Sequence, residues 1–229
     1  MIAFFVCVIF FRVAEVWVFF RTSCIGQLIL GAPEKPPGIH IPKFEDTDDR
    51  RLLESLIKAT TAAGLTIEQV NVGIVEVDSL NAASLGNHTF LLFEGLGRLT
   101  PQQRDAVMAH EVAHDVLGHA DQSKARHGTL SKTVGVLGAL INSEKEARDQ
   151  VASWTGGLVF PAFEKEQEFA ADARGVEILR KMGYKRSAQQ IMASALRALK
   201  DEYGDSGGGY FDSHPATSDR IKLIESSGK

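Results

Sequence analysis

The chain has 229 residues, of which 44% are hydrophobic, and its 25 basic residues stand against 29 acidic ones. Phosphate binding needs a surplus of Lys and Arg, so this balance argues against a nucleic-acid partner. The hydrophobic fraction is too high for a disordered chain, and the length is enough to bury a sizeable core.

The first 20 residues differ from the rest, because 18 of them are apolar and they hold six of the 13 Phe residues. A helix of this length crosses much of a bilayer. Arg12 and Glu15 interrupt the segment, however, and no basic residue precedes it as in a standard signal peptide. We expect an uncleaved membrane anchor or a cleaved export signal; a mis-chosen start codon and a helix buried in the fold are the alternatives. Cys24 also suggests a lipid anchor, although Arg21 takes the place of the aliphatic residue expected three positions earlier.

Composition divides the chain into a hydrophobic leader at 1–32, a Pro-rich linker at 33–44 and a folded domain at 45–229. Cys7 and Cys24 are the two cysteines, and both lie in the leader. The domain therefore has no disulfide framework and no thiolate metal site.

Apolar periodicity and capping residues predict the elements of the domain in chain order. We expect a helix over 47–63 that ends at Gly64, strands over 70–77 and 89–93, and a loop over 81–87 between the strands. A helix over 100–120 has the strongest signals, since Thr100 and Gln103 form a capping box and Pro101 follows the cap. Further helices are expected over 129–141, from 143, over 161–182, over 187–202 with Ser187 and Gln190 as its cap, and over 215–225.

The sequence His110-Glu111-Val112-Ala113-His114 lies inside the helix with the strongest signals. Residues four apart on a helix point the same way, so both imidazoles can reach one Zn²⁺ ion. Glu111 lies close enough to hold a metal-bound water without ligating, which is the position of a general base. A chance match on an amphipathic helix is the alternative.

A catalytic zinc needs a third protein ligand, and Glu168 is the candidate. Glu168 and Asp172 are four apart on the helix predicted over 161–182, so they share a face. Asp172 can then accept the free ring N–H of a zinc-bound His. Taken alone, this segment reads more simply as a solvated acidic face; the histidine pair favours the ligand.

The other histidines are weaker candidates. His119 falls about 180° from His110 on a continuous helix, so we do not expect it to be a ligand. We expect His40 and His127 at surface or loop positions, and His88 could face the cleft. His214 precedes Pro215, where it could cap the last helix, donate to an oxyanion, or act as a fourth zinc ligand that blocks the site.

Together these residues resemble the gluzincin zinc endopeptidases of peptidase family M48, which include HtpX-like, Oma-type and CAAX-prenyl-protease-like enzymes. The resemblance covers about residues 45–226. It rests on Asn81-Ala82 with the stretch 86–95, the segment 110–119, Glu168 to Asp172, and Ser213-His214-Pro215 with Arg220. The stretch after Asn81 departs from the usual family pattern.

The resemblance implies an α+β fold, a mostly helical gluzincin-type zincin domain with a small antiparallel sheet over the zinc-binding helix. It implies one Zn²⁺ per chain held by His110, His114 and Glu168, with Glu111 as base and His214 stabilising the oxyanion. It also implies polypeptide substrates that bind as an extended strand along an edge strand, expected at 89–93.

We therefore expect a zinc-dependent endopeptidase of the cell envelope that acts in protein quality control and is tethered or exported by its leader. The alternative from another class is a zinc-stabilised, chaperone-like binding module with little proteolytic activity. Hydrolysis of something other than a peptide is a third possibility.

Overall fold

A computed structural model describes residues 12–13, 16–17, 38–127, 163–204, 210, 213–215 and 217–227. The chain divides into two compact units, 1–35 and 36–229, which are considered separately. In the first unit, β1 (Arg12–Val13) pairs antiparallel with β2 (Val16–Trp17). No helix within the described ranges has the length and apolar character that a membrane crossing requires. The rest of the leader, and with it the predicted anchor, lies outside the described residues.

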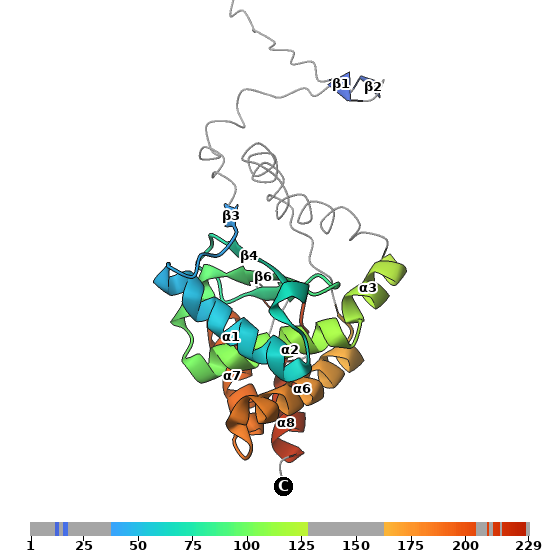
Figure 1. The fold of residues 1–229 in the computed structure, drawn as a ribbon. Helices are drawn as coiled ribbons and strands as arrows, with labels where there is room; N and C mark the ends of the chain where they lie inside the picture. Colours follow the sequence, from blue (N-terminus) through green and yellow to red (C-terminus); the bar gives the residue numbers. More distant parts are fainter. Residues whose placement is uncertain are drawn as a thin grey trace, which may run out of the picture. The chain divides into compact units, whose positions relative to one another are not determined.

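The second unit packs helices around one central helix, as Figure 1 shows. This helix, α2 (Pro101–Val116), contacts α1 (Thr47–Ala63), α6 (Lys165–Leu179) and α7 (Ala188–Tyr203) as well as the sheet. Helix α8 (Thr217–Ser226) packs on α6 and α7. Short 3₁₀ turns at Ile67–Gln69 and Glu94–Arg98 link the first half of the unit, and α3 (His119–His127) follows α2.

The sheet has four strands in the order β3-β4-β6-β5. Their bounds are Ile39–His40 for β3, Asn71–Val75 for β4, Ala82–Ser84 for β5 and Thr89–Phe93 for β6. Strands β3 and β5 pair antiparallel with their neighbours, but β4 and β6 run parallel, with Asn71 opposite Thr89 and Val75 opposite Phe93. The sheet is therefore mixed, and the prediction of an antiparallel sheet was wrong.

Strands β4 and β6 are parallel because, after β4, the chain first forms the outer strand β5 and only then turns back to form β6. Residues 82–84, predicted as part of a loop, form the edge strand β5, and a tight turn then returns the chain as β6 between β5 and β4. Gly86, Asn87 and His88 all have positive φ angles of 79°, 50° and 55°, as such turns require. Strand β6 is thus interior, which contradicts its predicted role as an edge strand; β5 has that place.

Local signals predicted most helix ends in the described ranges. Helix α1 has the predicted bounds, begins at the cap Asp46 and ends at Gly64 in the left-handed conformation. The capping box of Thr100 and Gln103 is present in α2, but the helix ends at Val116 because Gly118 turns left-handed with φ 69°. Helix α6 is shorter than the predicted 161–182, since Glu164 caps it and a π-turn over Arg180–Tyr184 follows it.

The predictions for the other helices need correction or fall outside the described residues. Ser187 makes no side-chain capping bond to α7, contrary to prediction, although the helix bounds agree within a residue. Helix α8 starts at Thr217, two residues after Pro215. The helices predicted over 129–141 and from 143 lie outside the described residues.

The main core lies between α2 and its neighbours and one face of the sheet. Leu52 and Leu56 of α1, Phe90 of β6, Met108 of α2 and Leu196 of α7 are all nearly inaccessible to solvent. Burying apolar area of this kind stabilises a fold by about 25 cal/mol per Å². A smaller buried cluster includes Leu85, Leu91 and Phe93 of the β5–β6 hairpin. Helix α2 is thus enclosed on several sides, which is what removes its histidines from water.

Candidate metal centre

Helix α2 presents His110 and His114 toward the same point. The two rings are one turn apart, and their Nε2 atoms lie 2.9 Å from each other. Their exposed fractions are 1% and 0%, because α2 is covered by the helices and by β5. The i,i+4 spacing thus produces the convergence expected from the sequence.

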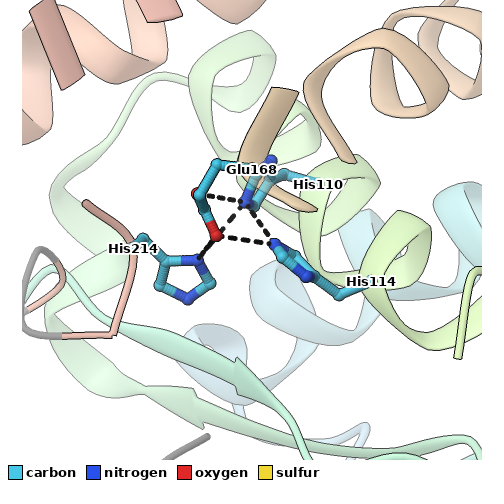
Figure 2. Close-up of side chains that lie close together, drawn as sticks. All are labelled: His110, His114, Glu168 and His214. Atoms are coloured by element: carbon cyan, nitrogen blue, oxygen red, sulfur yellow. Dashed lines mark hydrogen bonds and ion pairs between the residues drawn. The ribbon is translucent and has the colours of Figure 1, made fainter. Parts of the chain in front are cut away.

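Helix α6 brings Glu168 to the same point, as Figure 2 shows. Its Oε1 lies 3.1 Å from Nε2 of His114, and its Oε2 lies 3.4 Å from Nε2 of His110. The two helices approach closely at Gly175, where an added Cβ would lie 3.4 Å from the backbone of Ala109 and 2.6 Å from Cε of Met192. Glu168 is fully buried, so it does not belong to a solvated acidic face.

His214 completes the cluster from the segment that precedes α8 (Figure 2). Its Nδ1 lies 3.1 Å from Oε1 of Glu168 and 3.4 Å from Nε2 of His110. Its Nε2 points the other way and lies 3.5 Å from Oε1 of Glu111. The side chain is fully buried and faces the cluster.

The four side chains His110, His114, Glu168 and His214 could hold a metal ion, since one donor atom from each lies within 4.8 Å of all the others. A tetrahedral zinc site with bonds of about 2.0–2.1 Å places its ligand atoms about 3.3 Å apart. Five of the separations between donor atoms in this cluster lie between 2.9 and 3.4 Å, close to that value. Imidazole and carboxylate donors also suit zinc chemically. The residues therefore fit a zinc ion.

Glu111 lies beside the cluster, and both of its carboxylate oxygens are held. The backbone N–H of Ser84 in β5 donates to Oε2 at 2.9 Å, and the Tyr210 hydroxyl donates to Oε1 at 3.2 Å. The side chain is fully buried. It is thus a buried, ordered acceptor next to the donor atoms.

Asp172 and Arg220 lie behind the cluster. Oδ1 of Asp172 lies 2.9 Å from Nδ1 of His110, where it accepts the ring N–H. Arg220 donates to both oxygens of Asp172, at 2.7 and 2.8 Å, and its Nη1 lies 2.6 Å from Oε2 of Glu168. Arg220 is fully buried, so its charge balances two buried carboxylates.

These contacts decide the protonation of the site. Burial would raise the pKa of Glu168, but Arg220 and His214 hold it well below its usual value, and Asp172 is shifted the same way by Arg220. Burial and the neighbouring His110 hold the pKa of His114 well below its usual value. Burial and Arg220 lower the pKa of His110, but its bonds to Asp172 and Glu168 outweigh them and raise it to about 9. A metal ion would therefore find ionised carboxylates and a neutral His114, and would have to displace a proton from His110.

His119 lies elsewhere than predicted. Because α2 ends before Gly118, the chain turns and His119 begins α3 instead of continuing around α2. Its Nδ1 lies 3.0 Å from Nδ1 of His114, and the ring is buried. His119 is outside the group of metal donors. Its ring nevertheless contacts the ring of His114, a contact that a continuous helix would not have allowed.

His88 and His40 do not join the cluster. His88 lies in the β5–β6 turn and bonds Asp115 of α2, with Nδ1 2.5 Å from Oδ2. His40 on β3 contacts Asp49 and Glu76. His127 ends α3.

Three further residues at the site were assigned no role by motif reasoning. They are Tyr210, Phe163 and Arg220. The ring of Phe163 stacks on that of His114, with centroids 3.8 Å apart. Arg220 entered the sequence prediction only as part of the family resemblance. Each lies about 50 to 110 residues from its partner on α2. No local periodicity connects such positions, although a lone Arg in an otherwise apolar helix face is a weak signal of a buried ion pair.

Comparisons with known proteins identify the family of the chain. The model of Peptidase family M48 matches residues 46–227. The chain is 28% identical over 165 residues to "Metalloprotease LoiP" of Escherichia coli (strain K12), an alignment that covers 69% of this chain and 62% of LoiP, less than two thirds of that relative. It is 23% identical over 218 residues to "Protease HtpX" of Cellvibrio japonicus (strain Ueda107), covering 82% of this chain and 74% of the relative. The chain therefore belongs to peptidase family M48, a class of metal-dependent hydrolases that act on peptide bonds.

Proposed function

We propose that this protein is a zinc-dependent endopeptidase in which His110, His114 and Glu168 hold one Zn²⁺ and Glu111 is the general base. The observation that carries the proposal is the buried cluster of donor atoms with the carboxylate of Glu111 ordered beside it. When bound, zinc would supply Lewis-acid polarisation of the scissile carbonyl and of the attacking water. Glu111 would accept the proton of that water and pass it to the leaving amine.

His214 can serve in two ways. Its Nδ1 is already among the donor atoms, so the side chain can complete a four-coordinate site. Hydrolysis needs that fourth place for water and substrate. We assign His214 the stabilisation of the oxyanion, which requires the ring to leave the donor set and turn an N–H toward the carbonyl oxygen.

The substrate in this proposal is a polypeptide that binds as an extended strand. Strand β5 supports this, because it is the outermost strand next to α2 and its Ser84 N–H already points to Glu111 instead of to β6. Main-chain pairing along such an edge binds many sequences, which suits unfolded substrates. The β5 edge replaces the edge first expected at 89–93.

A role in protein quality control at the cell envelope completes the proposal. Its support is the apolar leader, which would export or tether the domain. Fractionation of cells that express the full chain tests this part, and a protein found wholly in the cytosolic fraction would refute it.

The central test is Glu111→Gln in the full-length chain, with unfolded casein as substrate and zinc content measured on the same samples. General-base catalysis contributes about 10²- to 10⁴-fold, so we expect at least a hundredfold loss of kcat with one zinc per chain in both proteins. Glu54→Gln, at an exposed position on α1, is the matched control. Equal rates for wild type and Glu111→Gln would instead favour the chaperone-like binding module.

A further inference from the structure

Tyr210 lies beside the cluster of metal donors but has no part in the reaction proposed above. Its side chain is 1% exposed. The ring stacks on His214, with centroids 4.1 Å apart and an interplanar angle of 10°, and it lies 6.3 Å from the ring of His110. A Phe ring would fill this space equally well, so packing alone does not account for the hydroxyl.

The hydroxyl of Tyr210 lies 3.2 Å from Oε1 of Glu111, whereas the Ser84 amide bonds Oε2. An ionised carboxylate only accepts hydrogen bonds, so the tyrosine is the donor. The two donors come from different segments, one from the edge strand β5 and one from the segment before His214. Each oxygen of Glu111 therefore accepts a hydrogen bond of its own. Nε2 of His214 also lies 3.5 Å from the oxygen that Tyr210 bonds.

Two partners hold the carboxylate in a way that one cannot. The last torsion of a Glu side chain is broad, since it joins an sp³ to an sp² carbon. A single bond from Ser84 fixes one oxygen but leaves the carboxylate plane free to rotate about it. The second bond, from Tyr210, sets the plane and so the direction of the lone pair that takes the proton.

We propose that Tyr210 is a positioning residue that holds the plane of the Glu111 carboxylate through its hydroxyl, together with the Ser84 amide. The inference rests on the proposed function of Glu111 as base. Tyr210 itself transfers no proton and touches no substrate in this role. Its ring also stacks on His214, so the one side chain contacts both Glu111 and His214.

The test is Tyr210→Phe in the full-length, zinc-loaded protein, because Phe keeps the ring and removes only the hydroxyl. A hydrogen bond to a charged group is worth enough to change a rate by about ten- to a hundredfold, so we expect kcat to fall by that factor. KM should stay within about twofold and zinc content should not change, since neither depends on the base. Tyr203→Phe is the matched control, because its hydroxyl bonds Ser79 at 2.8 Å away from the cluster; it should keep the wild-type kcat.

A double variant separates positioning from packing. If Tyr210 acts through Glu111, adding Tyr210→Phe to Glu111→Gln should leave the residual rate unchanged, whereas a packing role predicts a further loss. A single-variant kcat within twofold of wild type, a change confined to KM, or a further loss in the double variant would each overturn the inference.

A binding measurement keeps the outcome independent of turnover. A peptide hydroxamate needs an acceptor at the place of Glu111, so its affinity, measured by calorimetry, reports where the carboxylate lies. We expect Tyr210→Phe to weaken hydroxamate binding about tenfold, and unchanged affinity would overturn the inference. Equal casein rates for wild type and Glu111→Gln would refute the proposed function, while hydroxamate binding would still decide on the position of Glu111.

Discussion

Replacing Arg220 with Met tests whether the buried charge network holds the site together. Arg220 is fully buried and contacts two carboxylates, Asp172 through both oxygens and Glu168 through one, at 2.6 to 2.8 Å. Met has a similar length but no charge. The substitution therefore leaves two buried carboxylates without their main counter-charge.

The expected cost follows from that geometry. Removing one partner of a buried ion pair destabilises a protein by about 3–5 kcal/mol, because the remaining charge stays desolvated. In a domain of this size each kcal/mol lowers Tm by about 2–4 °C, so a decrease of about 10 °C is expected. The effect should be largest in chelator, because a bound cation would replace part of the missing charge.

Urea denaturation in chelator, followed by circular dichroism, measures the loss directly. The matched control is Arg98→Met, whose guanidinium pairs with Asp78 and Glu202 but is 44% exposed. Exposed pairs contribute at most about 1 kcal/mol. If both Arg substitutions cost the same within 1 kcal/mol, burial does not set the strength of the Arg220 network and the reasoning fails.

Two further predictions concern the metal and pH. Asp172→Asn should weaken zinc binding about tenfold to a hundredfold, because Asp172 accepts the ring N–H of His110 at 2.9 Å. A competition titration with a chromophoric chelator measures the Kd for zinc, with the exposed Asp219→Asn as control. An unchanged Kd would mean that Asp172 serves Arg220 alone. The metal-free protein should lose stability as pH rises from 6.5 to 9, since the pKa of His110 is about 9 in the folded protein and 6.5 for an ordinary histidine. That contribution is complete below pH 6.5, is lost above 9 and amounts to at most about 3 kcal/mol. Urea midpoints at pH 6, 7.5 and 9 in chelator measure it, and a midpoint that rises with pH would contradict the sign.

Local chemistry in the sequence determined helix α2 and the spacing of its two histidines. The capping box of Thr100 and Gln103 and the four-residue spacing of His110 and His114 are properties of one helix, so they could be read without knowledge of the rest of the fold. The same holds for α1, whose apolar stripe and terminal Gly64 predicted its bounds, while the cap at Asp46 was identified in the structure.

Only the tertiary structure decided which distant segments meet at this helix. The β5–β6 hairpin places Ser84 at the sheet edge against Glu111, a consequence of strand order that alternation in a strand does not encode. One left-handed glycine, Gly118, turns His119 back toward His114 against the helical extrapolation. Tyr210 and Arg220 reach α2 across about 100 residues, because buried acceptors require partners wherever the chain can supply them. Spacing along the chain therefore determined the ligands on one helix, and packing decided the residues that hold and neutralise them.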